Sequence, residues 1–247
     1  MCDILSSGDI MELIFVRHAE PDYAKDSLTD KGRKEALLLS DMLIKENADF
    51  FYSSPLGRAK ETGMYTMKRL RKDFTVLPWL TEFEGKVKDG VKTTRCWDRL
   101  PSQWTKDEAH YGENWHSTSL MGRINVREEN EKVCKGIDEL LEKHGYRHEG
   151  KIFKVTNSNH DKIVFFCHFA VECVILAHLF GTSPMVFWHN FVALPSSVTR
   201  VVTEEREKGI ASFRTICFGD VSHLYYGHEK PSFAARYCEC FEDNTKH

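Results

Sequence analysis

The sequence predicts an α/β sandwich, because short apolar segments alternate with amphipathic ones through most of the chain. Residues 11–16 and 163–167 are nearly unbroken apolar runs, as in strands that are covered on both faces. Together with shorter apolar runs, these segments indicate one sheet. The shorter runs lie at residues 50–52, 76–77, 198–203 and 213–218.

Start and stop signals place helices between these strands. Thr29 can cap a helix that runs to about residue 45, and Pro55, with serine before it, is a start signal for a second helix to about residue 70. A long helix is expected at about 123–144, ended by Gly145. The apolar run 163–167 leads straight into a further helix that Gly181 closes.

The chain has no internal repeat and no low-complexity linker, which favours one domain over residues 11–247 after a loose extension at residues 1–10. Residues 84–120 lack clear periodicity and are interpreted as an inserted cap over the fold. This segment carries three tryptophans, which either wall a pocket or pack beneath the inserted loop. They are Trp97, Trp104 and Trp115.

Composition excludes several classes of protein. Hydrophobic residues make up 41% and charged residues 29% of the chain, as in ordinary globular proteins. The net charge is −3, without a Lys/Arg stripe, so no nucleic-acid partner is expected. No apolar run approaches the roughly 20 residues of a membrane-spanning helix, and the first ten residues lack a secretory signal. A cytoplasmic location without a membrane partner is therefore expected.

The cysteines do not form a metal-binding pattern. Eight are present, no Cys-x-x-Cys pair occurs, and Cys238 and Cys240 are too isolated for a finger-type zinc site. Reduced thiols are the expectation for a cytoplasmic protein. No metal ligand is assigned from the sequence.

Basic side chains follow three of the predicted strands. Arg17 and His18 come directly after the first strand, Arg58 lies one turn into the helix after the second, and His168 follows the run 163–167. In open α/β sheets, ligands bind beyond the carboxyl ends of the strands, where helix N-termini expose unpaired N–H groups. Two arginines and two histidines at this edge predict an anion pocket, with phosphate as its ligand.

Four ordered motifs resemble those of the histidine phosphatase superfamily, which includes the cofactor-dependent phosphoglycerate mutases. Residues 17–20, Arg-His-Ala-Glu, look like the family's Arg-His-Gly signature, and residues 53–62 are similar to its second motif. Residues 28–32 fit the loop and helix start between these two motifs. Residues 80–82 resemble the segment that holds the family's proton donor, and His168 stands where its second pocket histidine is expected.

The resemblance implies a phosphoglycerate mutase-like three-layer α/β/α sandwich with an inserted cap. It also implies a metal-independent phosphatase that needs no cofactor and acts on a small phosphorylated substrate. His18 would take the phosphoryl group as a phosphohistidine. Arg17, Arg58 and His168 would bind the phosphate oxygens and neutralise the charge on them.

The resemblance assigns the proton transfers to a carboxylate. Glu82 would protonate the leaving oxygen and later deprotonate water, with Glu84 as a rival two residues on. Tyr23 is a candidate substrate contact five residues after His18. Glu172, one helical turn beyond His168, could face the pocket or pair with a nearby cation.

Departures from the family pattern bear on the reaction. Phe169 and Ala170 follow His168 where the family typically has two glycines, which predicts a bulkier pocket floor. The residues after His18, Ala-Glu-Pro-Asp-Tyr at 19–23, differ from the continuation usual in mutases and favour hydrolysis. Two alternatives stay open: phosphoglycerate mutase-type phosphoryl transfer and a phospholigand-binding protein without turnover.

Overall fold

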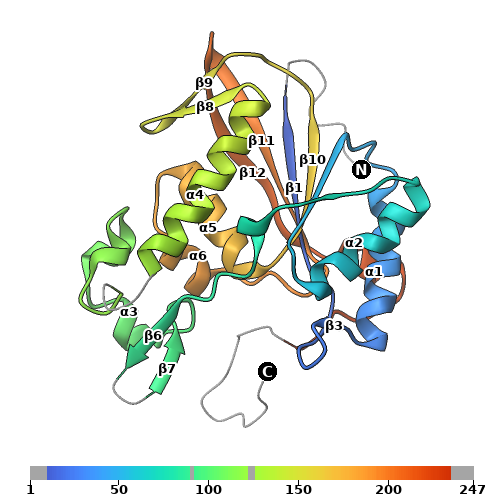
Figure 1. The fold of residues 1–247 in the computed structure, drawn as a ribbon, viewed down its shortest axis with the longest axis horizontal. Helices are drawn as coiled ribbons and strands as arrows, with labels where there is room; N and C mark the ends of the chain where they lie inside the picture. Colours follow the sequence, from blue (N-terminus) through green and yellow to red (C-terminus); the bar gives the residue numbers. More distant parts are fainter. Residues whose placement is uncertain (1–9, 90–91, 122–125, 235–247) are drawn as a thin grey trace.

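An eight-stranded sheet forms the centre of the molecule (Figure 1). The computed structural model describes residues 10–89, 92–121 and 126–234. The strand order is β5-β4-β10-β1-β11-β12-β9-β8, with the first four strands parallel. The parallel strands are β1 (Glu12–Arg17), β4 (Phe50–Ser53), β5 (Thr75–Val76) and β10 (Lys162–Cys167). The antiparallel strands are β8 (Tyr146–Glu149), β9 (Ile152–Val155), β11 (Val198–Glu207) and β12 (Ile210–Asp220).

Helices cover both faces of this sheet, so the predicted three-layer α/β/α sandwich is confirmed (Figure 1). The helices pack on each other within their layers. One layer consists of α1 (Asp30–Leu43), α2 (Gly57–Leu70) and the short α7 (Ser222–Tyr226). The other consists of α4 (Val126–Lys143), α5 (Phe169–Phe180) and α6 (Pro184–Asn190).

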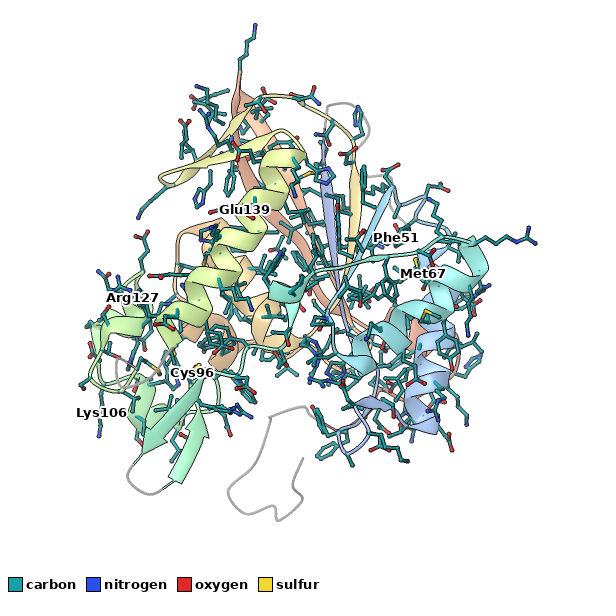
Figure 2. All side chains as sticks on the ribbon, viewed as in Figure 1. Phe51, Met67, Cys96, Lys106, Arg127 and Glu139 are labelled. Carbon is teal, nitrogen blue, oxygen red and sulfur yellow. The ribbon has the colours of Figure 1, made fainter. Side chains whose placement is uncertain are left out.

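The two central strands are apolar throughout because successive side chains enter different cores. In β1, Leu13 and Phe15 pack with the core beneath α4 and α5, whereas Ile14 and Val16 pack with the core beneath α1 and α2. Figure 2 labels Phe51 and Met67, which belong to this second core. A strand buried on both faces therefore carries no polar alternation until it ends.

The ends of the helices follow the predicted signals with one exception. Thr29 caps α1 by accepting a hydrogen bond from the Gly32 amide at 3.0 Å, and Gly181 ends α5 with a φ of 62°. The prediction that α2 begins at Pro55 is wrong, because α2 begins at Gly57. The Ser54 hydroxyl accepts a hydrogen bond from the Leu56 amide at 3.2 Å and holds a turn before the helix.

The hairpin β8–β9 was not predicted from the sequence. Its residues 146–149 are mostly polar, because the strands lie at the edge of the sheet, where one face meets solvent. Residues 122–125 of the predicted long helix lie outside the described residues, and α4 begins at Val126. Residues 1–9 of the predicted extension, with Cys238 and Cys240, also lie outside them.

The segment predicted as a cap lies outside the main sheet (Figure 1). Trp104 and Trp115 are only 7% and 2% exposed, so they pack beneath the cap, whereas Trp97 lines a cavity. Among the described residues, no helix is both long and apolar enough to cross a bilayer. The cap contains the hairpin β6 (Lys86–Asp89) and β7 (Lys92–Arg95), α3 (Pro101–Trp104), and the 3-10 turns η2 (Glu108–Tyr111) and η3 (Trp115–Ser117).

Candidate active site

The register of the parallel strands brings the predicted site residues together. Arg17 at the end of β1 is paired with Cys167 at the end of β10, so His18 and His168 leave the sheet side by side. The ring centroids of these two histidines lie 5.1 Å apart. Ser54 leaves β4 at the same edge, because its amide binds the Phe166 carbonyl at 2.9 Å. The predicted convergence at the carboxyl edge of the sheet is thus observed for these groups.

The hydrogen bonding of His18 determines which ring nitrogen is available. Its Nδ1 lies 2.8 Å from the Ala19 carbonyl oxygen, which can only accept, so Nδ1 carries the proton and Nε2 carries a lone pair. Burial lowers the pKa of His18 well below its ordinary value, and the charges of Arg17 and Arg58 lower it further. The ring is 1% exposed and neutral, as a nucleophile requires.

A carboxylate that the sequence did not reveal orients Arg58. Asp26 accepts hydrogen bonds from Nη1 of Arg58 at 2.7 Å and from the Gly57 amide at 2.6 Å. A Cβ at Gly57 would lie 2.1 Å from the Asp26 carbonyl oxygen, so this approach requires glycine. Nε of Arg58 is buried without a hydrogen-bond partner among the described residues, which leaves it available to a ligand.

His168 is held from one side only. Its Nε2 lies 2.7 Å from the Ser54 hydroxyl, while Nδ1 is buried with no partner in the described part of the chain. Burial lowers the pKa of His168 well below its ordinary value, with further contributions from His18, Arg58 and Arg17. A neutral His168 that accepts from Ser54 carries its proton on Nδ1, where it can donate to an anionic oxygen.

Arg17 contacts two groups near the sheet edge. Its Nη1 donates to the Ala193 carbonyl, and its guanidinium carbon lies 5.8 Å from the centroid of the Phe169 ring. Glu172 lies near this charge and is 1% exposed. Burial raises the pKa of Glu172 to about 7, against the opposing effects of a Thr199 hydrogen bond and of Arg17. Glu172 is therefore an interior group whose charge depends on pH near neutrality.

Glu82 differs from Glu84 in its surroundings. Oε1 of Glu82 accepts hydrogen bonds from the amides of Phe83 at 3.0 Å and Val171 at 3.3 Å, which leaves Oε2 for proton transfer. Burial raises the pKa of Glu82, although the charges of Arg17 and Arg58 oppose the shift. Glu84 is exposed and forms an ion pair with Lys86.

A cavity of about 440 Å³ lies between the cap and part of this site, and neither His18 nor His168 is among the residues that line it. The sheet edge contributes Arg17, Arg58 and Glu82, and the cap contributes Arg95 and Trp97. Tyr23, Phe169 and Ala170, which the sequence analysis singled out, also line this cavity. The Tyr23 side chain is 59% exposed, and its ring centroid lies 5.4 Å from the guanidinium carbon of Arg58.

Asp26→Ala tests the orientation of Arg58. We expect kcat/KM for a phosphomonoester to fall about 10- to 100-fold, because Arg58 loses the partner that holds its guanidinium in place. The matched control is Asp22→Ala in the same loop, since Asp22 pairs with the exposed Lys25 at 3.1 Å. Equal kcat/KM values for the two variants would show that Asp26 does not orient Arg58.

A model of the histidine phosphatase superfamily, branch 1, matches residues 13–215. The chain belongs to this superfamily. The match includes both basic motifs, the Glu82 segment and His168. The family that the sequence motifs resembled is therefore confirmed.

Relatives of known activity share the fold of this superfamily member. The chain is 21% identical over 217 residues to phosphoserine phosphatase 1 of Hydrogenobacter thermophilus, covering 84% of this chain and 94% of that protein. A phosphoserine phosphatase variant from Entamoeba histolytica, in complex with phosphoserine, superposes with a TM-score of 0.58 at 19% identity, over 87% and 99% of the two chains. A mycobacterial glucosyl-3-phosphoglycerate phosphatase superposes with a TM-score of 0.57 at 16% identity, over 85% and 99%.

Proposed function

We propose that this protein is a metal-independent phosphomonoester hydrolase that acts on a small phosphorylated metabolite through a phosphohistidine at His18. One observation carries the proposal: a neutral histidine with Nε2 unprotonated lies beside cationic groups at the carboxyl ends of the parallel strands β1 and β10. Membership of the histidine phosphatase superfamily supports it. The fold likeness to phosphatases that act on phosphorylated metabolites agrees with it.

In the first half-reaction, Arg17, Arg58 and His168 bind the non-bridging oxygens of the phosphate. Nε2 of His18 attacks phosphorus and forms a P–N bond while the P–O bond to the leaving group breaks. Glu82 in its protonated form, which burial favours by raising its pKa, donates its proton to the leaving oxygen. The products are an alcohol and the phosphoenzyme.

In the second half-reaction, the Glu82 carboxylate removes a proton from a water molecule. The water oxygen attacks phosphorus, the P–N bond breaks, and its electron pair returns to Nε2 of His18. Inorganic phosphate leaves, and Glu82 is again protonated. Glu82 thus acts first as an acid and then as a base, and the site returns to its starting state.

Turnover of p-nitrophenyl phosphate in EDTA, with no bisphosphoglycerate present, tests the proposal. We expect steady release of inorganic phosphate from this substrate under these conditions. Transfer only between positions of a phosphoglycerate would instead identify a mutase. Binding of phosphate without release from a broad substrate panel would identify a non-catalytic phospholigand-binding protein.

We further propose that the metabolite carries a carboxylate, which Arg95 of the cap binds. Arg95 lines the same cavity as Arg17 and Arg58, and its Nη1 donates to the Glu84 carbonyl at 2.8 Å. The named substrates of the relatives, phosphoserine and glucosyl-3-phosphoglycerate, both combine a phosphate with a carboxylate. Phosphoserine and 3-phosphoglycerate are therefore the first compounds to assay.

Arg95→Gln tests this assignment. The KM for the carboxylated substrate should rise about 10- to 100-fold, as expected for one lost charge-assisted hydrogen bond. Turnover of p-nitrophenyl phosphate, which has no carboxylate, should change little. Arg147→Gln on the exposed edge strand β8 is the control. An equal loss with both substrates would contradict a role in carboxylate binding.

We also propose that residues 11–247 form one histidine phosphatase domain with a cap at about 84–120. We propose a cytoplasmic location for the protein, without a nucleic-acid or membrane partner. The thiols agree with a reducing compartment, because the five cysteines of the described residues are free. Three of these, Cys96, Cys167 and Cys173, are buried in the core.

A further inference from the structure

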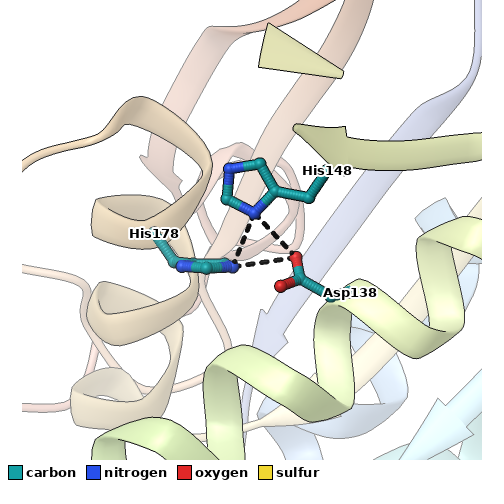
Figure 3. A group of neighbouring side chains, drawn as sticks. All are labelled: Asp138, His148 and His178. Atoms are coloured by element: carbon teal, nitrogen blue, oxygen red, sulfur yellow. Dashed lines mark hydrogen bonds and ion pairs between the residues drawn. The ribbon is translucent and has the colours of Figure 1, made fainter. Parts of the chain in front are cut away.

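Three side chains far from the candidate active site converge on one point (Figure 3). Asp138 lies on α4, His148 on β8, and His178 in the last turn of α5. Oδ1 of Asp138 is 3.1 Å from Nδ1 of His148 and 2.8 Å from Nε2 of His178. The two ring nitrogens are 3.2 Å apart, so the three atoms form a nearly equilateral triangle.

This spacing matches the ligand spacing around a small metal ion. Tetrahedral zinc with ligands at about 2.0–2.1 Å places neighbouring ligand atoms about 3.3 Å apart. The three observed separations, 2.8, 3.1 and 3.2 Å, are shorter than that value by about half an ångström or less. The three ligand atoms need only move slightly apart to admit the ion.

Hydrogen bonds alone satisfy this triangle poorly. Oδ1 of Asp138 is the hydrogen-bond partner of both ring nitrogens, which also face each other at 3.2 Å. A bound cation instead uses one lone pair from each of the three atoms.

The rings are held in position by packing. The His148 ring stacks on Phe153, with centroids 4.5 Å apart and an interplanar angle of 9°. The His178 ring lies nearly perpendicular to it, at 84° and 4.6 Å. The ligand directions therefore depend on rigid elements of the fold rather than on a loop, as a preorganised metal site requires.

The triangle borders a cavity of about 250 Å³ that gives an ion access and leaves room for solvent ligands. His148 and His178 line this cavity together with Cys134 and Asn130. Cys134, one turn before Asp138 on α4, does not belong to the group of atoms that lie within 4.8 Å of one another, so a water molecule is left as the fourth ligand.

We propose that Asp138, His148 and His178 bind one divalent transition-metal ion of the zinc type, with its fourth position open to this cavity. Two imidazole nitrogens and one carboxylate favour Zn²⁺ and Co²⁺ over Mg²⁺. The ten residues that separate His168 from His178 span about 15 Å along α5, so the ion stays outside the phosphate pocket. The bound ion would link α4, β8 and α5 and raise the stability of the folded chain.

Titration of EDTA-treated, metal-free full-length protein with Co²⁺ tests the site directly. We expect one Co²⁺ per chain, with the visible absorption of a four-coordinate ion. Zn²⁺ in excess should raise the Tm by several degrees, because it binds only the folded chain, and Mg²⁺ should not. Absence of both the Co²⁺ absorption and the Zn²⁺-dependent rise in Tm would overturn the proposal.

Variants locate the binding. His148→Gln and His178→Gln should each lose the Co²⁺ absorption while their metal-free circular dichroism stays that of the unmodified protein. Should either variant unfold, Asp138→Asn provides the same test. His18→Ala and the exposed His228→Asn should retain full binding. Binding that survives in the cluster variants, or that disappears in His18→Ala, would overturn the assignment, and none of these readouts depends on phosphatase turnover.

Discussion

His18→Ala is expected to lower kcat for p-nitrophenyl phosphate by at least about 10³-fold, the loss of a few kcal/mol of transition-state stabilisation. The reason is that His18 has a neutral nitrogen lone pair beside the arginines, whereas the lone pair on Nε2 of His168 faces the Ser54 hydroxyl at 2.7 Å. The variant removes the nucleophile but not the phosphate-binding groups. Initial rates in EDTA measure the effect.

Two controls distinguish loss of the nucleophile from loss of the folded structure. Inorganic phosphate should still protect the His18→Ala variant against thermal unfolding, because Arg17, Arg58 and His168 remain. His228→Asn, at an exposed position with a φ of 55°, should retain full turnover. Near-normal turnover by His18→Ala would exclude this residue as the nucleophile.

Glu82→Gln is expected to have an effect that depends on the leaving group. With phosphoserine, whose alkoxide needs a proton to leave, kcat should fall about 10²- to 10⁴-fold. With p-nitrophenyl phosphate the first half-reaction should be nearly normal, because nitrophenolate leaves without protonation. The second half-reaction still needs a base, so stopped-flow absorbance should show a burst of nitrophenolate followed by a slow phase.

Glu84→Gln is the matched control, because Glu84 is exposed and paired with Lys86. It should show neither the burst nor the large loss with phosphoserine. If Glu84→Gln reproduced the behaviour expected for Glu82→Gln, the proton donor would be Glu84. Equal losses with both substrates in the first half-reaction of Glu82→Gln would contradict acid catalysis by Glu82.

The pH profile follows from the shifted pKa values of the same two residues. Activity requires neutral His18, whose pKa is lowered, so activity should persist well below pH 6.5 and fall only at more acidic pH. It also requires protonated Glu82, whose pKa is raised, so activity should decline on the alkaline side of that pKa. In Glu82→Gln the alkaline decline of kcat/KM should disappear while the acid limb stays.

The sequence was informative where side chains follow strands directly. The apolar runs of β1 and β10 are long enough to identify, and the pairing of Arg17 with Cys167 places His18 beside His168 without any loop geometry. The same reasoning located Arg58, because the serine-rich turn after β4 ends in a helix. The position of His18 beside His168 and the two arginines could therefore be predicted from the sequence.

The sequence was uninformative where contacts depend on loops or on distant elements. Asp26 lies 32 positions from Arg58 and reaches it only because its own backbone adopts a φ of 48° and approaches Gly57. Asp138, His148 and His178 share no spacing typical of metal ligands and meet only when α4, β8 and α5 pack. Such contacts depend on tertiary packing, which local patterns do not encode.

Trapping the phosphoenzyme tests the central claim most directly. The Glu82→Gln variant is mixed with p-nitrophenyl phosphate and quenched in alkali. The protein should then retain a phosphoryl group, because phosphohistidine is stable in base. Peptide mass spectrometry should then find one phosphoryl group on the peptide that contains His18, and none in His18→Ala. A phosphoryl group on a different residue, or turnover without any phosphoenzyme, would contradict the account.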